Sequence, residues 1–263
     1  MRFASLGSGS EGNALLAEVP AAVPGGILTR VLVDCGFGLR ELERRLARLG
    51  LAAADQIDAI LVTHEHGDHV GGVFRLARAR RIPVYLTDGT RRGCLQAADG
   101  CDGMLRVIDS HRPFEVGGLR VEPFPVPHDA REPVQYVLDD GRSRLGVLTD
   151  IGHPTAHLPA ALSGLTALVL ETNHDPGLLA DSDYPPALKR RIAGRYGHLD
   201  NADSARILAG LDRTRLRRVV AAHLSRQNNR PKLAREALAE VLGWPADAVD
   251  VADQDDGLGW TDA

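Results

Sequence analysis

Four side chains of the types that bind metal ions lie within six consecutive positions: His64, His66, Asp68 and His69. They follow the apolar run 59–62 and surround Gly67. A short apolar run bounded by a glycine-containing polar turn is typical of a buried strand that ends in a sharp loop. Imidazole and carboxylate groups are ligands that zinc, manganese and iron accept in proteins. The stretch therefore predicts a metal-binding loop, and an exposed loop that contains histidines by chance is the weaker alternative.

Further potential ligands follow other predicted strands. The apolar runs 31–33, 119–124, 145–149 and 218–222 each end at or close to one such residue, in the order Asp34, His128, Asp150 and His223. A buried carboxylate without a partner is costly, so an acid at a strand end is expected to have hydrogen-bond or metal partners. Chance does not account for this recurrence at strand ends in both halves of the chain. We interpret these residues, together with the histidine-rich loop, as one functional set.

The elements that must position these residues alternate along the chain. Residues 14–18 and 29–34 are expected to form a hairpin joined by 20–26, and leucines 39, 42, 46 and 49 have helical spacing. Further helices are expected over 73–79, 89–97, 186–192, 202–211 and 233–242. Repeated units of strand, functional residue, loop and helix predict two sheets packed face to face with helices outside. That is a four-layer αββα sandwich of the α/β (α+β) class, expected as a single domain over residues 1–263.

The composition is that of an ordinary globular protein, with 44% hydrophobic residues, 25% charged residues and a formal charge of −4. That charge excludes a chain that is basic overall. For the arginine-rich stretch 213–218 a solvated helix end or turn is favoured, with a local positive patch as the alternative. Cys35, Cys94 and Cys101 lack CxxC spacing, so we expect free thiols and a cytoplasmic location. Neither a secretion signal nor a membrane span is expected from the hydropathy pattern.

The ordered set resembles the signature of the metallo-β-lactamase-fold hydrolase superfamily, and the resemblance extends from the His-x-His-x-Asp-His loop to His223. It implies two divalent ions, Zn²⁺ or Mn²⁺ with iron as a further option. By motif position, one ion would be held by His64, His66 and His128, and the other by Asp68, His69 and His223. Asp150 would bridge both ions, and Asp34 would orient the histidine loop from behind the ligands. Two ions about 3.5–4 Å apart activate a bridging water as hydroxide, so the implied reaction is hydrolysis, with Asp68 also holding or accepting the proton of the water.

Two further residues resemble a pair found in the ribonuclease Z group of this superfamily. Glu171 lies at a predicted strand end, and His198 lies just before a predicted helix. The resemblance implies that His198 donates a proton to the leaving group and stabilises the transition state, and that Glu171 orients it. A helix-capping histidine and a strand-end glutamate are the alternative.

A finer resemblance is to the bacterial YycJ/WalJ-like branch, which is associated with DNA exonuclease activity. It rests on motifs at 5–13, 128–133, 171–175, 197–199 and 223–229. The chain has no room for an inserted cap domain or a long tRNA-gripping arm, which favours short or end-bound nucleic acid or a small phosphodiester. A loop rich in glycine and serine at residues 7–13 exposes N–H and hydroxyl groups that suit an anion. Candidate substrate or phosphate contacts are Ser8, Ser10, Asn13, His174 and Ser225.

The leading hypothesis is therefore a dinuclear metal-dependent phosphodiesterase, specifically a nuclease, with DNA exonuclease activity as its most specific form. The same chemistry could hydrolyse a small carboxyl derivative such as a lactone, thioester or β-lactam. A non-catalytic metal-binding module is the third hypothesis, which the intact ligand set disfavours. The expected partner is a nucleic acid or another phosphodiester and not a membrane. The sequence leaves the oligomeric state open, a homodimer included.

Overall fold

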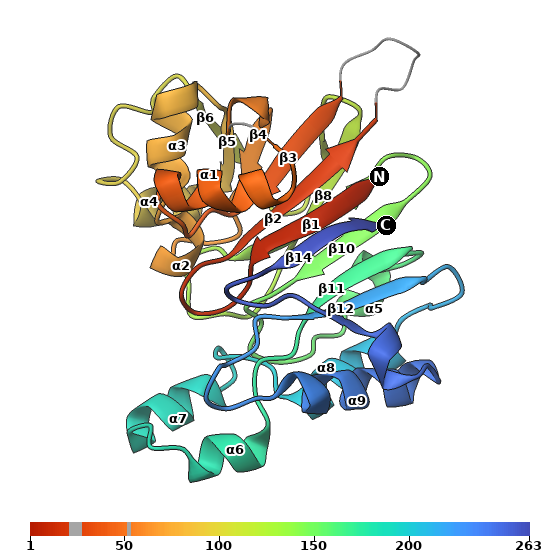
Figure 1. Cartoon of the computed structure of the whole chain (residues 1–263). Coiled ribbons are helices and arrows are strands. Elements are labelled where there is room, and N and C mark those ends of the chain that lie inside the picture. The colour runs from red at the N-terminus through yellow and green to blue at the C-terminus, as the bar shows by residue number, and fades with distance from the viewer. Residues whose placement is uncertain (21–27, 52–53) are drawn as a thin grey trace.

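Two seven-stranded sheets form the centre of the molecule in the computed structural model, which describes residues 1–20, 28–51 and 54–263 (Figure 1). The first sheet has the order β14-β1-β2-β3-β4-β5-β6 and the second β13-β12-β11-β10-β9-β8-β7. The first contains β1 (Arg2–Gly7), β2 (Ala14–Val19), β3 (Thr29–Val33), β4 (Ala59–Leu61), β5 (Val84–Thr87), β6 (Leu105–Ile108) and β14 (Leu258–Asp262). The second contains β7 (Phe114–Val116), β8 (Leu119–Pro125), β9 (Val134–Asp139), β10 (Arg144–Leu148), β11 (Ala167–Glu171), β12 (Arg218–Ala222) and β13 (Asp250–Val251).

Helices cover the outer face of each sheet, and two helices of the second half stand apart from the sheets as a lobe (Figure 1). Those of the first half are α1 (Leu39–Arg48), α2 (Gly67–Val70), α3 (Val73–Arg80) and α4 (Asp88–Gly93), with the 3₁₀ turn η1 (Ala54–Gln56). Those of the second half are α5 (Leu158–Ala161), α6 (Pro176–Asp181), α7 (Pro186–Ile192), α8 (Asn201–Ala209) and α9 (Pro231–Leu242), with η2 (Ala246–Ala248). None of the helices in the described ranges is long and apolar enough to cross a lipid bilayer.

Three apolar layers hold these four layers of secondary structure together. One lies between α1, α3 and the first sheet and includes Leu42 and Leu76. The middle one lies between the two sheets and includes Leu138, which is fully buried. The third lies under α8 and α9 and includes Leu208. Burying one such side chain contributes about 1.5–3 kcal/mol, so the sandwich is stabilised by every layer. The predicted αββα architecture is confirmed.

Parallel strands place the residues that follow them at one edge of each sheet. Strands β3, β4, β5 and β6 pair in parallel, and so do β10, β11, β12 and β13. Because the carboxyl ends of parallel strands meet at the same edge, the segments after β3 and β4 are neighbours, as are those after β10, β11 and β12. This topology brings the strand-end residues of the sequence to one end of the sandwich.

Some local predictions were wrong at the boundaries. The helix expected over 89–97 ends at Gly93, a residue of low helix propensity, and turns follow over 94–100. The predicted hairpin of β2 and β3 is confirmed, whereas its connection at 21–27 lies outside the described residues. Strand β14, beside β1, was not predicted from the sequence. Its Trp260 packs under the Arg2 guanidinium, 4.1 Å from the ring centre.

Candidate metal centre

The histidine loop is held in place mainly by its backbone. After β4 the chain turns into α2, the single helical turn that carries Asp68 and His69. The Asp68 carbonyl accepts a hydrogen bond from Asn13 N at 2.8 Å, and the His69 carbonyl accepts one from Cys35 N at 2.8 Å. A Cβ atom on Gly36 would lie 2.0 Å from the Asp68 oxygen, so only glycine permits this close approach. The loop is thus fixed against both neighbouring strand ends.

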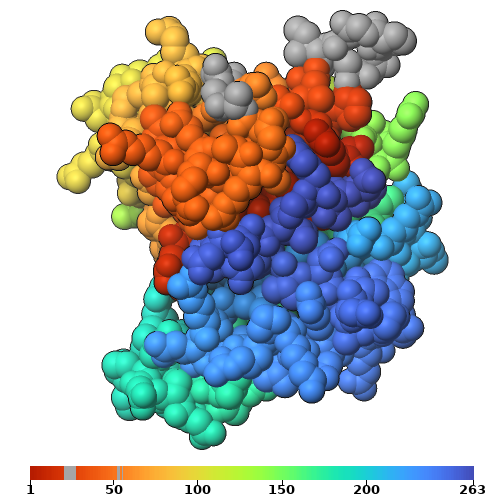
Figure 2. Space-filling model, viewed as in Figure 1, coloured from red at the N-terminus to blue at the C-terminus, as the bar shows by residue number. Residues whose placement is uncertain are grey.

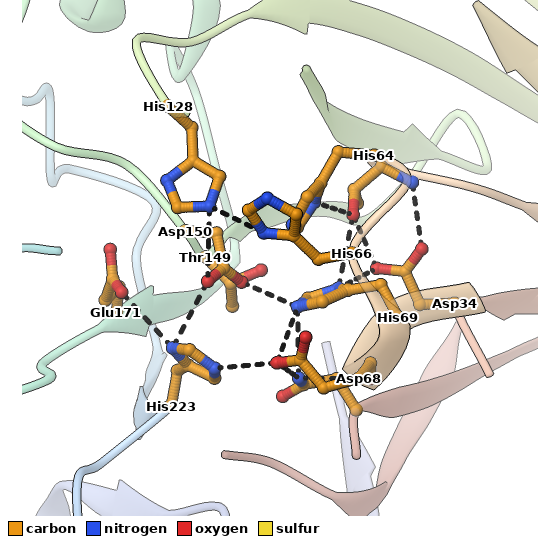
Figure 3. A network of polar contacts seen from close by, with 12 residues as sticks. Asp34, His64, His66, Asp68, His69, His128, Thr149, Asp150, Glu171 and His223 are labelled. Atoms are coloured by element: carbon orange, nitrogen blue, oxygen red, sulfur yellow. Dashed lines mark hydrogen bonds and ion pairs between the residues drawn. The ribbon is translucent and has the colours of Figure 1, made fainter. Parts of the chain in front are cut away.

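The predicted ligands converge on two adjoining clusters (Figure 3). In each cluster the potential ligand atoms lie within 4.8 Å of one another, and the two sets are His64, His66 and His128, and Asp68, His69 and His223. Asp150 belongs to a further set with His64 and His69, and its Oδ2 lies 2.9 Å from His69 Nε2. Asp150 Oδ1 lies 3.5 Å from His223 Nδ1, in the same cluster as His69, and 3.9 Å from His128 Nε2 of the other cluster. The Asp150 carboxylate therefore stands between the two clusters, where a bridging ligand would have to stand.

Three residues of this centre have left-handed backbone conformations. Asp34, Asp150 and His223 have φ values of 59°, 49° and 53°, and they are three of the four non-glycine residues with positive φ in the described ranges. Each follows a strand directly or after one residue. Such conformations cost on the order of 1–3 kcal/mol each and persist only where the surroundings impose them. The backbone is thus turned sharply at the points where a side chain must face the centre.

Asp34 supports the cluster from behind. Its Oδ1 accepts a hydrogen bond from Thr63 N at 2.8 Å, and its Oδ2 accepts one from Thr63 Oγ1 at 2.7 Å. Oδ2 also lies 2.8 Å from His69 Nδ1, and the Asp34 side chain is almost fully buried. A proton on Nδ1 shared with this carboxylate leaves His69 Nε2 free as a ligand atom.

Two buried imidazole nitrogens show that the residues present fit a metal. His64 Nε2 and His223 Nε2 are buried and have no hydrogen-bond partner within the described part of the chain. An unpaired buried polar atom costs about 1–3 kcal/mol, so such atoms call for a partner. Both nitrogens belong to the ligand clusters. The donor set of imidazoles and carboxylates suits zinc, manganese or iron, and it lacks the thiolates of closed structural zinc sites.

The electrostatics of the two clusters differ. Burial lowers the pKa of His64 well below its usual range, assisted by the charge of His69, and burial also lowers the pKa of His128. Burial acts in the same direction on His69, but the Asp150 and Asp34 carboxylates outweigh it and hold the pKa of His69 well above its usual range. Asp150, Asp68 and Glu171 similarly overcome burial and raise the pKa of His223 to about 10. The carboxylates around His69 and His223 therefore make this cluster electrostatically negative, which favours the binding of a cation.

Glu171 and His198 lie together at the edge of this centre. Glu171 Oε1 is 2.7 Å from His198 Nδ1, and Glu171 Oε2 accepts a hydrogen bond from Ile151 N at 2.8 Å. Glu171 is fully buried at the end of β11, whereas His198 is partly exposed. Since Nδ1 faces the carboxylate, His198 Nε2 is the ring nitrogen left for a bound molecule.

The five residues predicted to contact substrate or phosphate have different positions. Ser10 and Ser225 line a pocket beside His198 and His223. Ser8 is buried, and its Oγ accepts a hydrogen bond from His223 N at 2.8 Å.

The other two candidates, Asn13 and His174, are also buried. The Asn13 amide bonds to both backbone groups of Gly9 and lies 3.3 Å from Asp68 Oδ2, so it braces the metal centre. The Nδ1 of His174 has no hydrogen-bond partner among the described residues.

The sequence reasoning missed two residues at the rim. Asp129 Oδ1 lies 3.4 Å from His128 Nε2 and 3.6 Å from His66 Nε2. Its other oxygen accepts a hydrogen bond from Arg191 Nε of α7 at 2.7 Å. Asp129 could have been found as the neighbour of His128, whereas nothing in the pattern of α7 marks Arg191.

Comparisons with known proteins agree with this geometry. The profile of the β-lactamase superfamily domain matches residues 29–224. The chain is 33% identical to the exodeoxyribonuclease YycJ of Bacillus anthracis over 243 residues, which cover 92% of this chain and 89% of that protein. It is 30% identical to the exodeoxyribonuclease WalJ of Streptococcus pneumoniae over 248 residues, which cover 92% and 88%.

Among solved structures, the metallo-β-lactamase fold protein YhfI from Bacillus subtilis superimposes with a TM-score of 0.75 at 16% identity, covering 100% of this chain and 99% of that one. At this identity the structural likeness shows the shared fold alone. The family match and the two relatives carry the assignment, because they span most of the chain. The protein belongs to the β-lactamase superfamily domain family.

Proposed function

We propose that this protein is a dinuclear metal-dependent phosphodiesterase that acts as a nuclease, with DNA exonuclease activity as its most specific form. The Glu171–His198 pair carries the proposal, because it stands beside two ligand clusters that share one carboxylate. Its Nδ1-to-carboxylate distance of 2.7 Å suits a histidine that gives up a proton and is stabilised while charged. The two relatives named exodeoxyribonucleases, which match over most of the chain, support a nucleic acid as the substrate.

In this proposal each protein group has a defined task. The two ligand clusters would hold a pair of divalent ions, which when bound would supply Lewis-acid activation of water and of the phosphoryl oxygens. Asp68, whose side chain is partly exposed, takes the proton of the attacking water as its oxygen bonds to phosphorus. The phosphorus–oxygen ester bond breaks on the opposite side, and His198 Nε2 gives its proton to the leaving oxygen. Glu171, which is buried and bonded to Nδ1, stabilises the charged imidazolium form of His198 from which this proton comes.

The ligand chemistry favours Zn²⁺ or Mn²⁺, with iron as a further option, and two ions per chain. The pairing of three-residue clusters on either side of Asp150 supports that number. Cys35, Cys94 and Cys101 are buried and free, which supports a cytoplasmic location for the enzyme.

The test is cleavage of end-labelled duplex DNA, single-stranded DNA and RNA, each with Mn²⁺ or Zn²⁺ and with a chelator. Asp68→Ala serves as the control for contaminating nucleases. Cleavage that disappears with the chelator and in Asp68→Ala supports the proposal, and the pattern of labelled products gives its polarity. If fully metallated protein leaves all three polymers intact, the nuclease proposal fails, and lactones and thioesters become the substrates to assay.

A further inference from the structure

A basic segment projects from the sandwich beside the candidate metal centre. Helices α6 and α7 form a lobe at the lower left of the molecule, apart from the two sheets (Figures 1 and 2). Residues 184–199 contain Lys189, Arg190, Arg191 and Arg195 and no aspartate or glutamate, so their formal charge is +4, whereas the whole chain has −4. With Asp181 and Asp183 included, residues 176–199 still have a formal charge of +2, opposite in sign to that of the whole chain.

The end of this segment is fastened to the ligand loops. Tyr196 O accepts a hydrogen bond from Asp129 N at 3.1 Å, and Gly197 O lies 3.1 Å from His128 Nδ1. Arg195 O lies 2.7 Å from His153 Nδ1. These three carbonyls contact the loops that follow β8 and β10, so the backbone of residues 195–197, which carries Arg195 and Tyr196, has a fixed position relative to the metal centre.

Tyr196 exposes its ring without a packing reason. Its exposed fraction is 61%, and among the described residues only Leu95 and Val107 are other large hydrophobic side chains exposed to a comparable extent. Its backbone is anchored at the metal-ligand loop, two residues before His198. An exposed aromatic ring in a basic setting is the arrangement on which an unpaired nucleobase stacks.

The guanidinium groups nearby differ in their partners. Arg191 is paired with Asp129, whereas Arg190 and Arg195 are exposed and have no ion pair or side-chain hydrogen bond within residues 1–20, 28–51 and 54–263. One face of α7, with Leu188, Arg191 and Ile192, forms a wall of the pocket that His198 and His223 close on the other side. This pocket has a volume of about 220 Å³, less than the roughly 300 Å³ at which sites for whole drug-sized ligands begin. The pocket is large enough for one residue of a polymer, and the rest of the polymer would then lie along the basic surface outside it.

We propose that α7 and the Arg195–Tyr196 turn bind a single strand of nucleic acid and lead its end to the metal centre. This inference rests on the proposed nuclease function and names the form of its substrate. One phosphate contacts Arg195 and one base stacks on Tyr196, whereas Arg190, about half a turn round α7 from Leu188 and Ile192, contacts a phosphate farther along the strand. A base inside a duplex is covered by its neighbours, so the ring selects an unpaired strand or a frayed end.

The test is a binding measurement that needs no turnover. Fluorescence anisotropy of a labelled single-stranded oligonucleotide is followed with the metal-free protein in chelator, over a series of salt concentrations. Tyr196→Ala should weaken binding roughly 5- to 150-fold, the range for loss of one stacked base, and Tyr196→Phe should retain it. The double variant Arg190→Ala/Arg195→Ala should lower the slope of log K against log salt by about 1.4, for two lost phosphate contacts.

The matched control is Arg142→Ala/Arg217→Ala, which removes the same charge next to the amino ends of β10 and β12, at the sheet end opposite Asp150 and His223. It should bind like the wild type, and thermal unfolding should show that all variants fold. If the wild type cleaves nucleic acid but Tyr196→Ala and the Arg190/Arg195 variant bind like the control, the surface proposal is overturned and the nuclease function stands. If the wild type neither binds nor cleaves any nucleic acid, both proposals fail together.

Discussion

Replacement of Asp34 by asparagine should weaken metal binding although Asp34 is not among the predicted ligands. In the wild type, Asp34 Oδ2 lies 2.8 Å from His69 Nδ1 and fixes the proton there. An asparagine can keep the bond from Thr63 N, but its amide group then faces His69 as a donor. The imidazole must either lose that partner or move its proton to Nε2, where the metal would bind.

The size of the effect follows from the bonds involved. Loss of one charge-assisted hydrogen bond at a buried site costs about 1.5–3 kcal/mol. Loss of a residue that orients a metal-binding histidine lowers metal affinity about 10- to 100-fold, equivalent to about 1.4–2.8 kcal/mol. The first cost applies to the folding of the metal-free protein and the second to metal binding. The metal-free variant should therefore also unfold roughly 3–12 °C below the metal-free wild type.

The assay is competition for Zn²⁺ against a chromophoric chelator, combined with thermal unfolding of the metal-free proteins. Glu18→Gln is the matched control, because Glu18 is a buried carboxylate that bonds Arg2 and Arg30 across β1, β2 and β3, away from the ligands. It should be destabilised without a change in zinc affinity. Wild-type zinc affinity in Asp34→Asn, measured on folded protein, would refute the role of Asp34.

Three further predictions concern single side chains. Asp150→Ala should remove both metal ions at once, measured as metal content per chain, because its carboxylate lies 2.9 Å from His69 of one cluster and 3.9 Å from His128 of the other. His198→Ala should keep both ions and lose about 10²- to 10⁴-fold in turnover, measured on labelled DNA. Glu18 has a pKa lowered from 4.5; burial opposes this, but its bonds to Arg2 and Arg30 outweigh burial. The ionised carboxylate therefore contributes its full stabilisation above pH 4.5, and this contribution is lost as the pH falls below 4.5. The free energy of unfolding of wild type, measured in urea, should exceed that of Glu18→Gln by on the order of 1 kcal/mol at neutral pH, and this difference should shrink below pH 4.5.

Each of these has a clear contrary result. One retained equivalent of metal in Asp150→Ala would show that the clusters do not share this carboxylate. Full nuclease activity in His198→Ala would remove its role as proton donor. A difference between wild type and Glu18→Gln that stays constant from pH 7 to pH 3 would show that the buried carboxylate is not stabilised by its two arginines.

The architecture and the candidate ligand residues could be predicted because both correspond to short local patterns in the sequence. Short apolar runs that end in histidine or aspartate show where strands stop, and parallel pairing then brings those ends together. His64, His128 and His223 were predicted in this way, and the structure brings them to one end of the sandwich. That they bind metal stays a prediction until it is measured.

What escaped prediction depends on contacts between distant segments. The ion pair of Asp129 and Arg191 joins residues 62 positions apart, and α7 carries no periodic pattern that distinguishes Arg191 from its basic neighbours. Strand β14 pairs with β1 from the other end of the chain. It could be predicted only from the free edge that β1 would otherwise leave in the first sheet, and not from its own residues. The helix expected over 89–97 was predicted too long, because the helix propensity of this stretch is weak and Gly93 ends the helix.

The left-handed residues explain why a fold of this kind places chemistry at its strand ends. A strand that simply continued would carry its side chains alternately to the two faces of the sheet, where the apolar layers lie. A positive φ at Asp34, Asp150 and His223 turns the chain within one residue, so that the side chain faces the sheet edge instead. Asparagine, aspartate and histidine tolerate this conformation better than most residues. The same side chains bind metals, so one residue meets both demands, and the strain on the order of 1–3 kcal/mol per site is borne by the packed strands behind it.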